Sequence, residues 1–375
     1  MKEKICIGIV GVAAVIQVLL LVGLIIIPKY KPTNDKPDDA ISQAIYDIVG
    51  DEIYYQGKEE RSSSVLYYEY LIRDTNEHKS DYLDDLVIAV NETIIKKNIT
   101  NKVDIVFFHE LPGGSGQCIE LENYSDYKLE YPDCEGLQTL TITGFSRHCE
   151  ECIYDEPSIY MNLPNIKYLK VSEQVQKKAD EQDIDWYALW PSLESLEVYG
   201  RGESFKSKRP DDAISQNVYQ AVNSNAFYLG KSEDEETAEV YYKYYIRDKD
   251  KDVSEISDIV GAIVTAVNKA IKEENITDLV SINIYQCDEQ GKEALVLSLG
   301  NYSDFRLDYA DFEGMEVARI YGSDYEEHPY NCPETYISLP NIKYLYINRN
   351  IQKAAKKQGI DWYDYWPDLE KIVVS

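Results

Sequence analysis

The heptapeptide LPNIKYL occupies residues 163–169 and recurs unchanged at residues 339–345. Other short stretches on both sides of it are also written twice, at offsets that stay between 173 and 178 residues. They are PDDAISQ from Pro37 and Pro210, IRD from Ile72 and Ile246, NIT from Asn98 and Asn275, NYSD from Asn123 and Asn301, and DWY…WP from Asp185 and Asp361. A nearly constant offset over this length predicts one module duplicated in tandem. What both copies keep belongs to the fold or to a shared site.

The duplication divides most of the 375 residues into two domains. We expect a cytoplasmic tail (1–4), a transmembrane helix (5–27), a tether (28–36), a first module (37–199), a linker (200–209) and a second module (210–375). Each module is long enough to bury its own core. The linker reads GRGESFKSKR, a basic and polar composition that predicts a flexible, protease-sensitive connection.

The N-terminal segment predicts a membrane anchor. An apolar run of 23 residues extends from Ile5 to Ile27, with Gln17 as its one strongly polar member. As a helix it measures about 34 Å, enough to cross a hydrocarbon core of about 30 Å. No small-residue cleavage site follows, so an uncleaved signal anchor is favoured over a signal peptide. Lysines flank the run almost equally, but large domains translocate largely regardless of charge. We therefore expect a single-pass protein of the cell membrane with both modules extracellular.

Charge and tyrosine content narrow the classes of partner. The net charge is −29, and 33 tyrosines stand against 7 phenylalanines. A strongly acidic surface repels phosphates, which excludes nucleic acid as the expected partner. Tyrosine is enriched at recognition surfaces because it offers a large amphipathic area at small entropic cost. The composition favours a protein or glycan ligand.

Each module predicts an α/β fold. A helix is expected at residues 38–49 and 211–222, followed by a tyrosine-rich strand from Val65 or Val240 whose alternation places tyrosines on both faces. A long amphipathic helix and a further strand follow. Strand, helix and strand in this order predict a βαβ crossover and therefore parallel pairing.

The rest of each module carries short strands with an L-x-L pattern. Their steps are 21, 29 and 27 residues in the first copy and 21, 27 and 27 in the second. Such periods resemble leucine-rich repeats, which implies a short parallel stack with helical segments behind it. The match is partial, since only Asn123 and Asn301 stand at an Asn position like that of the family. The alternative is an ordinary α/β sheet whose parallel strands happen to be evenly spaced.

Two sets of aromatic residues are candidate binding residues. The tryptophans occur in pairs four residues apart, which places each pair on one face of a helical turn. They could form a platform for sugars or peptides, or they could close the apolar back of the last strand. The tyrosines could form a binding surface, or they could reflect β-propensity alone. The candidates are Trp186, Trp190, Trp362, Trp366, Tyr67, Tyr68, Tyr70, Tyr241, Tyr242 and Tyr244.

Neither a metal site nor a catalytic site is expected. His148, Cys149 and Cys152 form an HCxxC-like string that could bind zinc, but four ligands are not assembled and the second copy lacks the cysteine pair. Both copies keep acidic clusters that could serve hydrolysis or could simply be solvated acids in a turn. These clusters are Asp126, Asp133 and Glu135 in the first copy, and Asp304, Asp311 and Glu313 in the second. No cofactor is predicted.

Five asparagines (Asn91, Asn98, Asn123, Asn275 and Asn301) begin N-x-S/T sequences. Such sites matter in a eukaryotic secretory pathway. Lysine-rich, arginine-poor usage and the missing cleavage site favour a bacterial surface protein instead, in which these sites stay unused.

These observations predict a membrane-anchored extracellular recognition protein without catalysis. Two alternatives stay open. One is a hydrolase of extracellular or cell-wall polymers that uses the shared acids. The other is an acidic inhibitor or immunity-type protein that binds a basic partner, for which binding should weaken as salt rises.

Overall fold

The structure is a computed structural model. It describes residues 35–50, 53–61, 65–72, 83–111, 114–124, 136–143, 156–160, 163, 166–200, 204–247, 251–287, 293–302, 314–323 and 328–375. The predicted tail, the predicted transmembrane helix and residues 28–34 of the tether lie outside this part of the chain. Within it, no helix is both long enough and apolar enough to cross a membrane.

The first module is built on a mixed sheet whose eight strands lie side by side in chain order. The strands are β1 (Ile53–Arg61), β2 (Val65–Ile72), β3 (Lys102–Leu111), β4 (Gly114–Glu122), β5 (Thr139–Ile142), β6 (Tyr168–Ser172), β7 (Ser195–Tyr199) and β8 (Ser204–Lys208). The pairs β2–β3, β5–β6 and β6–β7 are parallel, and the other neighbours are antiparallel.

The second module repeats this arrangement in a sheet of seven strands. The strands are β9 (Ala226–Glu233), β10 (Val240–Ile246), β11 (Val280–Cys287), β12 (Glu293–Gly300), β13 (Val317–Ile320), β14 (Tyr344–Ile347) and β15 (Lys371–Val374). The pairs β10–β11, β13–β14 and β14–β15 are parallel, as in the first module. Two mixed sheets of the same plan confirm the tandem arrangement, while the exact module boundaries stay a prediction.

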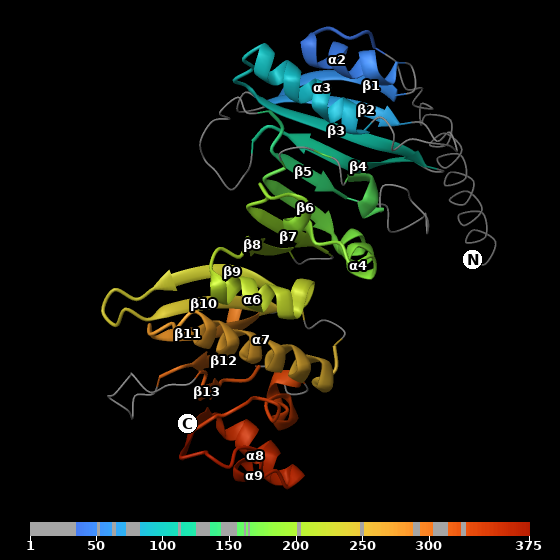
Figure 1. Cartoon of the computed structure of the whole chain (residues 1–375). Helices are drawn as coiled ribbons and strands as arrows, with labels where there is room; N and C mark the ends of the chain where they lie inside the picture. The colour runs from blue at the N-terminus through green and yellow to red at the C-terminus, as the bar shows by residue number, and fades with distance from the viewer. Residues whose placement is uncertain are drawn as a thin grey trace, which may run out of the picture.

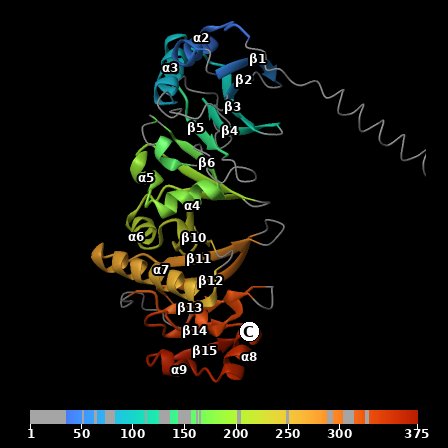
Figure 2. The same cartoon turned by 90° about the vertical axis from the view of Figure 1, so that its right-hand side faces the viewer.

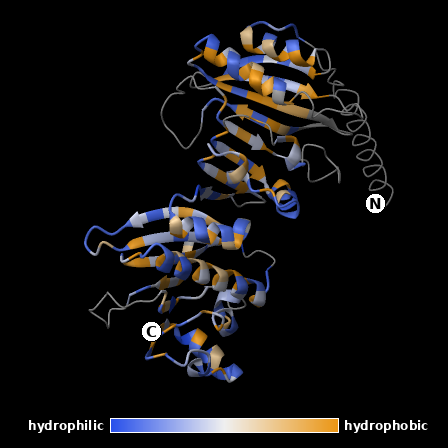
Figure 3. Ribbon diagram, in the orientation of Figure 1, coloured by the Kyte–Doolittle hydropathy of each residue, from blue (hydrophilic) through white to orange (hydrophobic). Residues whose placement is uncertain are grey.

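The described α-helices pack on one face of their own sheet. They are α2 (Ala40–Val49), α3 (Leu83–Lys96), α4 (Glu173–Glu181) and α5 (Trp186–Leu189) in the first module, and α6 (Ala213–Val222), α7 (Val253–Glu273), α8 (Arg349–Gln358) and α9 (Trp362–Tyr365) in the second. Each contributes buried residues to the apolar cluster of its module. The two modules stack end to end, with α2 at one end and α9 at the other (Figures 1 and 2). Hydrophobic and hydrophilic residues alternate along the strands (Figure 3), as expected for sheets buried chiefly on one face.

The predicted βαβ start is confirmed in both copies, because α3 connects parallel strands β2 and β3, and α7 connects β10 and β11. The prediction of four parallel strands after the βαβ unit is wrong for the first of them, β4. Two residues (112–113) separate β3 from β4, and a connection that short can join only antiparallel strands. β4 is consequently antiparallel to β3, and it is also antiparallel to β5. Three strands of the expected four are parallel, so the leucine-rich-repeat geometry does not extend over the module.

The duplicated motifs hold equivalent structural positions. In PDDAISQ, Asp39 and Asp212 are the N-caps of α2 and α6 and form capping boxes with serines three residues later, which satisfies amide groups that the helix itself leaves free. In NIT, Asn98 and Asn275 have φ of 49° and 50°. Asparagine tolerates this left-handed conformation better than most residues.

The NYSD motif ties neighbouring strands together. The Oδ1 atom of Asn123 accepts a 2.7 Å hydrogen bond from the amide of Val103, and Asn301 accepts one of 2.8 Å from the amide of Val280. Both asparagines are buried. The asparagine that suggested a leucine-rich repeat is therefore a bridge between two backbone segments of a mixed sheet.

The segment expected to be a flexible linker contains a strand. Residues 204–208 form β8, which pairs antiparallel with β7. Its Phe205 ring lies 4.3 Å from the ring of Tyr245 and 5.7 Å from that of Phe227, both in the second module. Arg209 donates to the backbone carbonyl of Pro191 at 2.9 Å. Apolar burial and main-chain pairing explain why a sequence with basic, polar composition is ordered here.

Candidate functional site on the helix-free sheet faces

Alternate residues of each strand point away from the helices, and we call this surface the helix-free face. In β2, Tyr68 and Tyr70 belong to the core cluster, so Tyr67 and Glu69, which alternate with them along the strand, point to the opposite side. In β10, Tyr242 and Tyr244 belong to the core, and Tyr241 and Lys243 occupy the helix-free face. The tyrosines of these strands thus lie on both faces, as predicted.

Most of the aromatic candidates are buried. Tyr67 is buried on the helix-free face of the first module, and its counterpart in the second module, Tyr241, is half-buried. The remaining eight lie in the cores: Tyr68, Tyr70, Tyr242, Tyr244, Trp186, Trp190, Trp362 and Trp366. Their place in the core accounts for their presence in both copies.

The tryptophan pairs close the apolar back of each module. Trp186 stacks on Trp190, and Trp362 on Trp366, in each case with ring centroids 5.4 Å apart. The Nε1 atom of Trp190 donates to the carbonyl of Leu163 at 2.8 Å. The corresponding bond from Trp366 to Leu339 measures 2.6 Å. This bond links the DWY…WP motif to LPNIKYL, which explains why the two motifs were kept together.

A second duplicated cluster joins the first helix of each module to its first two strands. Tyr68 donates to Asp39 at 2.6 Å, and Lys58 is paired with the same carboxylate at 2.8 Å. In the second copy, Tyr242 donates to Asp212 at 2.8 Å and Lys231 is paired with it at 2.7 Å. The groups are engaged with one another and with the helix terminus, so the cluster serves to fasten the helix.

The electrostatics of this cluster follow from its contacts. Partial burial would raise the pKa of Asp39, but hydrogen bonds from Lys58, Tyr68 and the amide of Ser42 outweigh it and lower the pKa of that carboxyl. The hydrogen bond to Asp39 raises the pKa of Lys58. Burial and the same carboxylate raise the pKa of the Tyr68 hydroxyl. Tyr68 therefore stays neutral and acts as a donor.

The helix-free face of the first module is acidic. Five carboxylates occupy outward positions of strands β2, β3, β4 and β7; they are Glu69, Asp104, Glu120, Glu122 and Glu197. Asp104 and Glu122 are buried. Two lysines share the face: Lys170 is the neighbour of Glu197 in β6, and Lys206 of β8 is paired with Glu197 at 3.8 Å. Burial and the carboxylates together raise the pKa of two nearby tyrosines. Burial, together with the carboxylate of Glu122, raises the pKa of Tyr124, and burial together with Glu120 and Glu197 raises the pKa of Tyr199.

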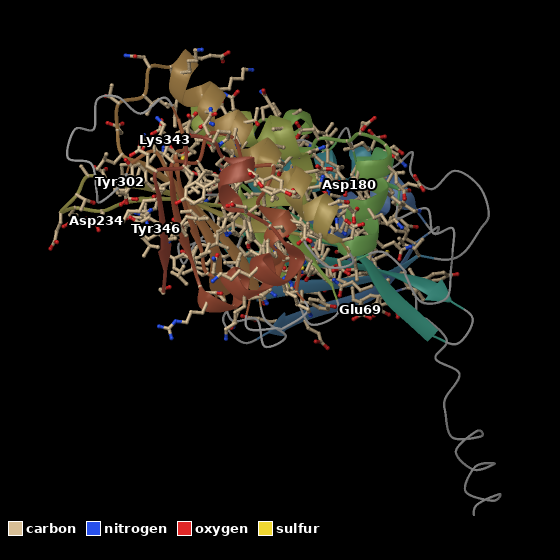
Figure 4. The ribbon with its side chains drawn as sticks, turned by 90° about the horizontal axis from the view of Figure 1, so that it is seen from below. Glu69, Asp180, Asp234, Tyr302, Lys343 and Tyr346 are labelled. Carbon is tan, nitrogen blue, oxygen red and sulfur yellow. The ribbon has the colours of Figure 1, made fainter. Side chains whose placement is uncertain are left out.

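The same face of the second module has different chemistry. Strand registers place Lys243, Ser281, Ser298, Gly300 and Val373 at the positions of the five carboxylates. Arg319 lies between two tyrosine rings, 5.6 Å from the centre of Tyr302 and 5.2 Å from that of Tyr346. Tyr302, Tyr346 and Lys343 are grouped on one side of the molecule, apart from Glu69 (Figure 4).

Two buried carboxylates near this second face are held by neighbours. Glu239 accepts a 2.5 Å hydrogen bond from Tyr241, which raises the pKa of Tyr241 to about 12. Glu316 is paired with Lys343 at 2.7 Å. Because both carboxylates already have partners, the groups best placed to meet a ligand on this face are the ring of Tyr346 and the guanidinium of Arg319.

A cleft of about 510 Å³ opens where the acidic face meets strand β1. Its lining includes Tyr67 and Glu69 of β2 and Glu59 of β1, with Asp35 and Asp38 beside them. The backbone of Asp35 donates to the carbonyl of Tyr55 at 2.9 Å, which fixes this wall. The cleft is also lined by Lys36, Lys58 and the buried Tyr55, and Lys58 is paired with Asp38 at 3.5 Å. Its four carboxylates therefore outnumber its two lysines, which leaves the cleft acidic.

The remaining candidates lie outside the described residues. They are the possible metal ligands His148, Cys149 and Cys152 and both acidic clusters (Asp126, Asp133 and Glu135; Asp304, Asp311 and Glu313). Among the residues that the structure does describe, no group of three or more His, Cys, Asp or Glu side chains is placed to hold a metal ion.

No protein-family model matches the chain, and no curated protein matches it. Two solved structures show weak similarity. One is the sex pheromone precursor of Lactobacillus salivarius subsp. salivarius, at 11% identity and a TM-score of 0.20 over 72% of this chain and 68% of that one. The other is the C-terminal domain of the sex pheromone staph-cAM373 precursor of Staphylococcus aureus, at 8% identity and a TM-score of 0.19 over 69% of this chain and 65% of that one. At such TM-scores neither similarity supports an argument about function.

Most of the aromatic residues that the two copies share lie in the cores and are not available to a ligand. Motif comparison selects what the two copies share, and those residues build the fold. The acidic face could have been found from differences between the copies at outward strand positions. Glu69, Glu120 and Glu197 of the first copy correspond to Lys243, Ser298 and Val373 of the second.

Proposed function

We propose that this chain is a membrane-anchored recognition protein of the cell surface whose first module binds a cationic protein through its acidic helix-free face. The observation that carries the proposal is the contrast between the copies: Glu69, Glu120 and Glu197 are replaced by Lys243, Ser298 and Val373 on the same sheet plan. A charge difference that the fold does not require is available for partner selection.

This contrast also separates the roles of the two modules. Tyr346 and Arg319 form an aromatic and cationic surface on the helix-free face of the second module. The strand registers place Lys170 and Thr141 at these positions in the first module, beside Glu120 and Glu197. The surface of the second module suits a different ligand, a glycan or an anionic peptide, rather than a second copy of the first ligand. The duplication then supplies two specificities on one anchor. The apolar run of residues 5–27 supports the anchor.

The test is binding of the full chain, in detergent micelles, to a small cationic protein such as lysozyme at about 20 mM and about 300 mM salt. The wild type should bind at low salt and release the partner as salt rises, because exposed charge pairs are screened. The variant Glu69→Lys/Glu120→Ser/Glu197→Val imports residues that the second module already places on the same sheet plan. It should fold normally and lose most of the binding.

A matched control changes equal charge away from the face. Glu233, Glu235 and Glu236 lie on the exposed end of β9 and the turn after it, and their replacement by Lys, Ser and Val should leave binding nearly unchanged. Equal losses in both variants would show that total charge, and not the face, attracts the partner, and would contradict the proposal.

The placement of the modules has its own test. A cysteine introduced at exposed Glu235 should react with an impermeant thiol reagent on intact cells if the modules are outside. Labelling that appears only after cell lysis would contradict the proposed orientation.

A further inference from the structure

The contact between the two modules within one chain shows what the C-terminal end of a module binds. Tyr219 of α6 donates to the carboxylate of Asp185 at 2.6 Å, and its ring meets the ring of Tyr187 edge-on at 5.5 Å. The hydroxyl of Tyr187 donates to the carbonyl of Ser207 in β8 at 2.9 Å. An aspartate and a tyrosine at the start of the short α5 helix thus receive a tyrosine from the first helix of the next module.

Both halves of this contact occur a second time, without a partner module. At the C-terminal end of the second module, Asp361 and Tyr363 open α9 as Asp185 and Tyr187 open α5. At the N-terminal end of the first module, Tyr46 of α2 stands where Tyr219 stands in α6. Asp35 packs against Gly57 as Lys208 packs against Gly230. The ion pair of Arg247 with Asp180 is not repeated, because Lys356 takes the place of Asp180.

Exposure separates the inner copy from the outer one. Tyr187 is 4% exposed and Tyr363 is 50% exposed; Val198 is 1% exposed and its counterpart Val374 is 44% exposed. Tyr46 is 37% exposed at the opposite end of the molecule. End units of repeat arrays normally carry a polar outer face. Here the outer face carries Tyr363, Tyr365 and Val374, so it has the character of an interface.

We propose that the C-terminal end of the second module binds the N-terminal end of the first module in another copy of this chain. The Tyr46 hydroxyl of one copy donates to Asp361 of the next, and its ring packs against Tyr363. The two ends lie at opposite extremes of the molecule (Figures 1 and 2), so one chain cannot join them. The contact is heterologous, and copies therefore add head to tail.

Sedimentation velocity of the full chain in detergent micelles tests this arrangement. The wild type should form dimers and longer species as its concentration rises. Tyr46→Arg and Tyr363→Arg should each weaken association about tenfold or more, because each replaces the hydrogen-bonded aromatic contact with an unpaired charge. Tyr321→Arg is the matched control, since Tyr321 is 48% exposed but lies after β13, away from both ends.

Mixing the two variants decides between modes of association. Each variant keeps one intact end, so an equal mixture should form dimers and stop there. A wild type that stays monomeric, variants that associate as well as the wild type, or a mixture that forms no dimer would each overturn the proposal. Association through the membrane segment, or through a symmetric interface away from both ends, would appear as variants that associate as well as the wild type. Unchanged thermal unfolding of both variants confirms that they are folded.

Discussion

At the scale of single residues, the side chains kept in both copies satisfy buried backbone groups or helix ends. Asn123 and Asn301 bridge strands, and Asp39 and Asp212 cap helices. Three of the five N-x-S/T asparagines (Asn91, Asn123 and Asn301) are buried. The Oδ1 atom of Asn91 accepts a 2.5 Å hydrogen bond from the backbone amide of Leu137. A sugar on these three side chains would break the contacts that explain their presence.

Asn301→Ala should lower the free energy of unfolding by about 1–3 kcal/mol, because it leaves the buried amide of Val280 without its acceptor. Chemical denaturation measures the change. Asn275→Gly is the control, since Asn275 is exposed with a φ of 50° and glycine adopts this conformation freely. Equal losses in the two variants would contradict the bridging role.

Asp212→Ala should lower the free energy of unfolding by about 0.5–2 kcal/mol at neutral pH through loss of the helix cap. Partial burial would raise the pKa of Asp212, but hydrogen bonds from Lys231, the amide of Ser215 and Tyr242 lower it. Its stabilising effect is therefore present above the unfolded pKa of about 3.9 and is lost as pH falls through the lower folded pKa. Unfolding of wild type and variant from about pH 7 to about pH 2 should converge at the acid end. A constant difference would contradict the charge dependence.

At the scale of elements, β8 decides whether the modules act separately or as one array. It extends the first sheet by pairing with β7, and its Phe205 reaches into the second module. The composition of residues 200–209 predicted a flexible linker, and this prediction is wrong for β8. The contacts of Phe205 with Phe227 and Tyr245 of the second module order the strand, and composition does not reveal them.

Phe205→Ala should lower the free energy of unfolding by about 3 kcal/mol, since it removes a buried ring that stacks on Tyr245. It should also loosen the contact between β8 and the second module. Limited trypsin digestion should then cut after Lys206 or Lys208, which the paired strand protects in the wild type. Phe205→Leu keeps apolar volume and should lose less than about 1.5 kcal/mol. Rapid cleavage of the wild type at these residues would restore the flexible-linker interpretation.

At the scale of the whole molecule, a net charge of −29 opposes the compact state through self-repulsion. Raising salt from about 10 mM to about 150 mM should therefore raise the melting temperature, by about 2–4 °C for domains of this size. The variant Glu69→Lys/Glu120→Ser/Glu197→Val should show a smaller rise, because it removes three like charges from one face. A melting temperature that falls with salt would show that favourable ion pairs outweigh the repulsion.

Sequence alone established the duplication, the α/β class, the βαβ start and the tyrosines on both faces of one strand. Motif spacing and side-chain periodicity are local properties, and local physics controls helix caps, crossovers and alternation. Only the tertiary structure decided that β4 is antiparallel, that residues 204–208 form a strand, and that Tyr187 is covered while Tyr363 is exposed. These features depend on contacts between segments far apart in the chain, and identical motifs in the two copies experience different neighbours.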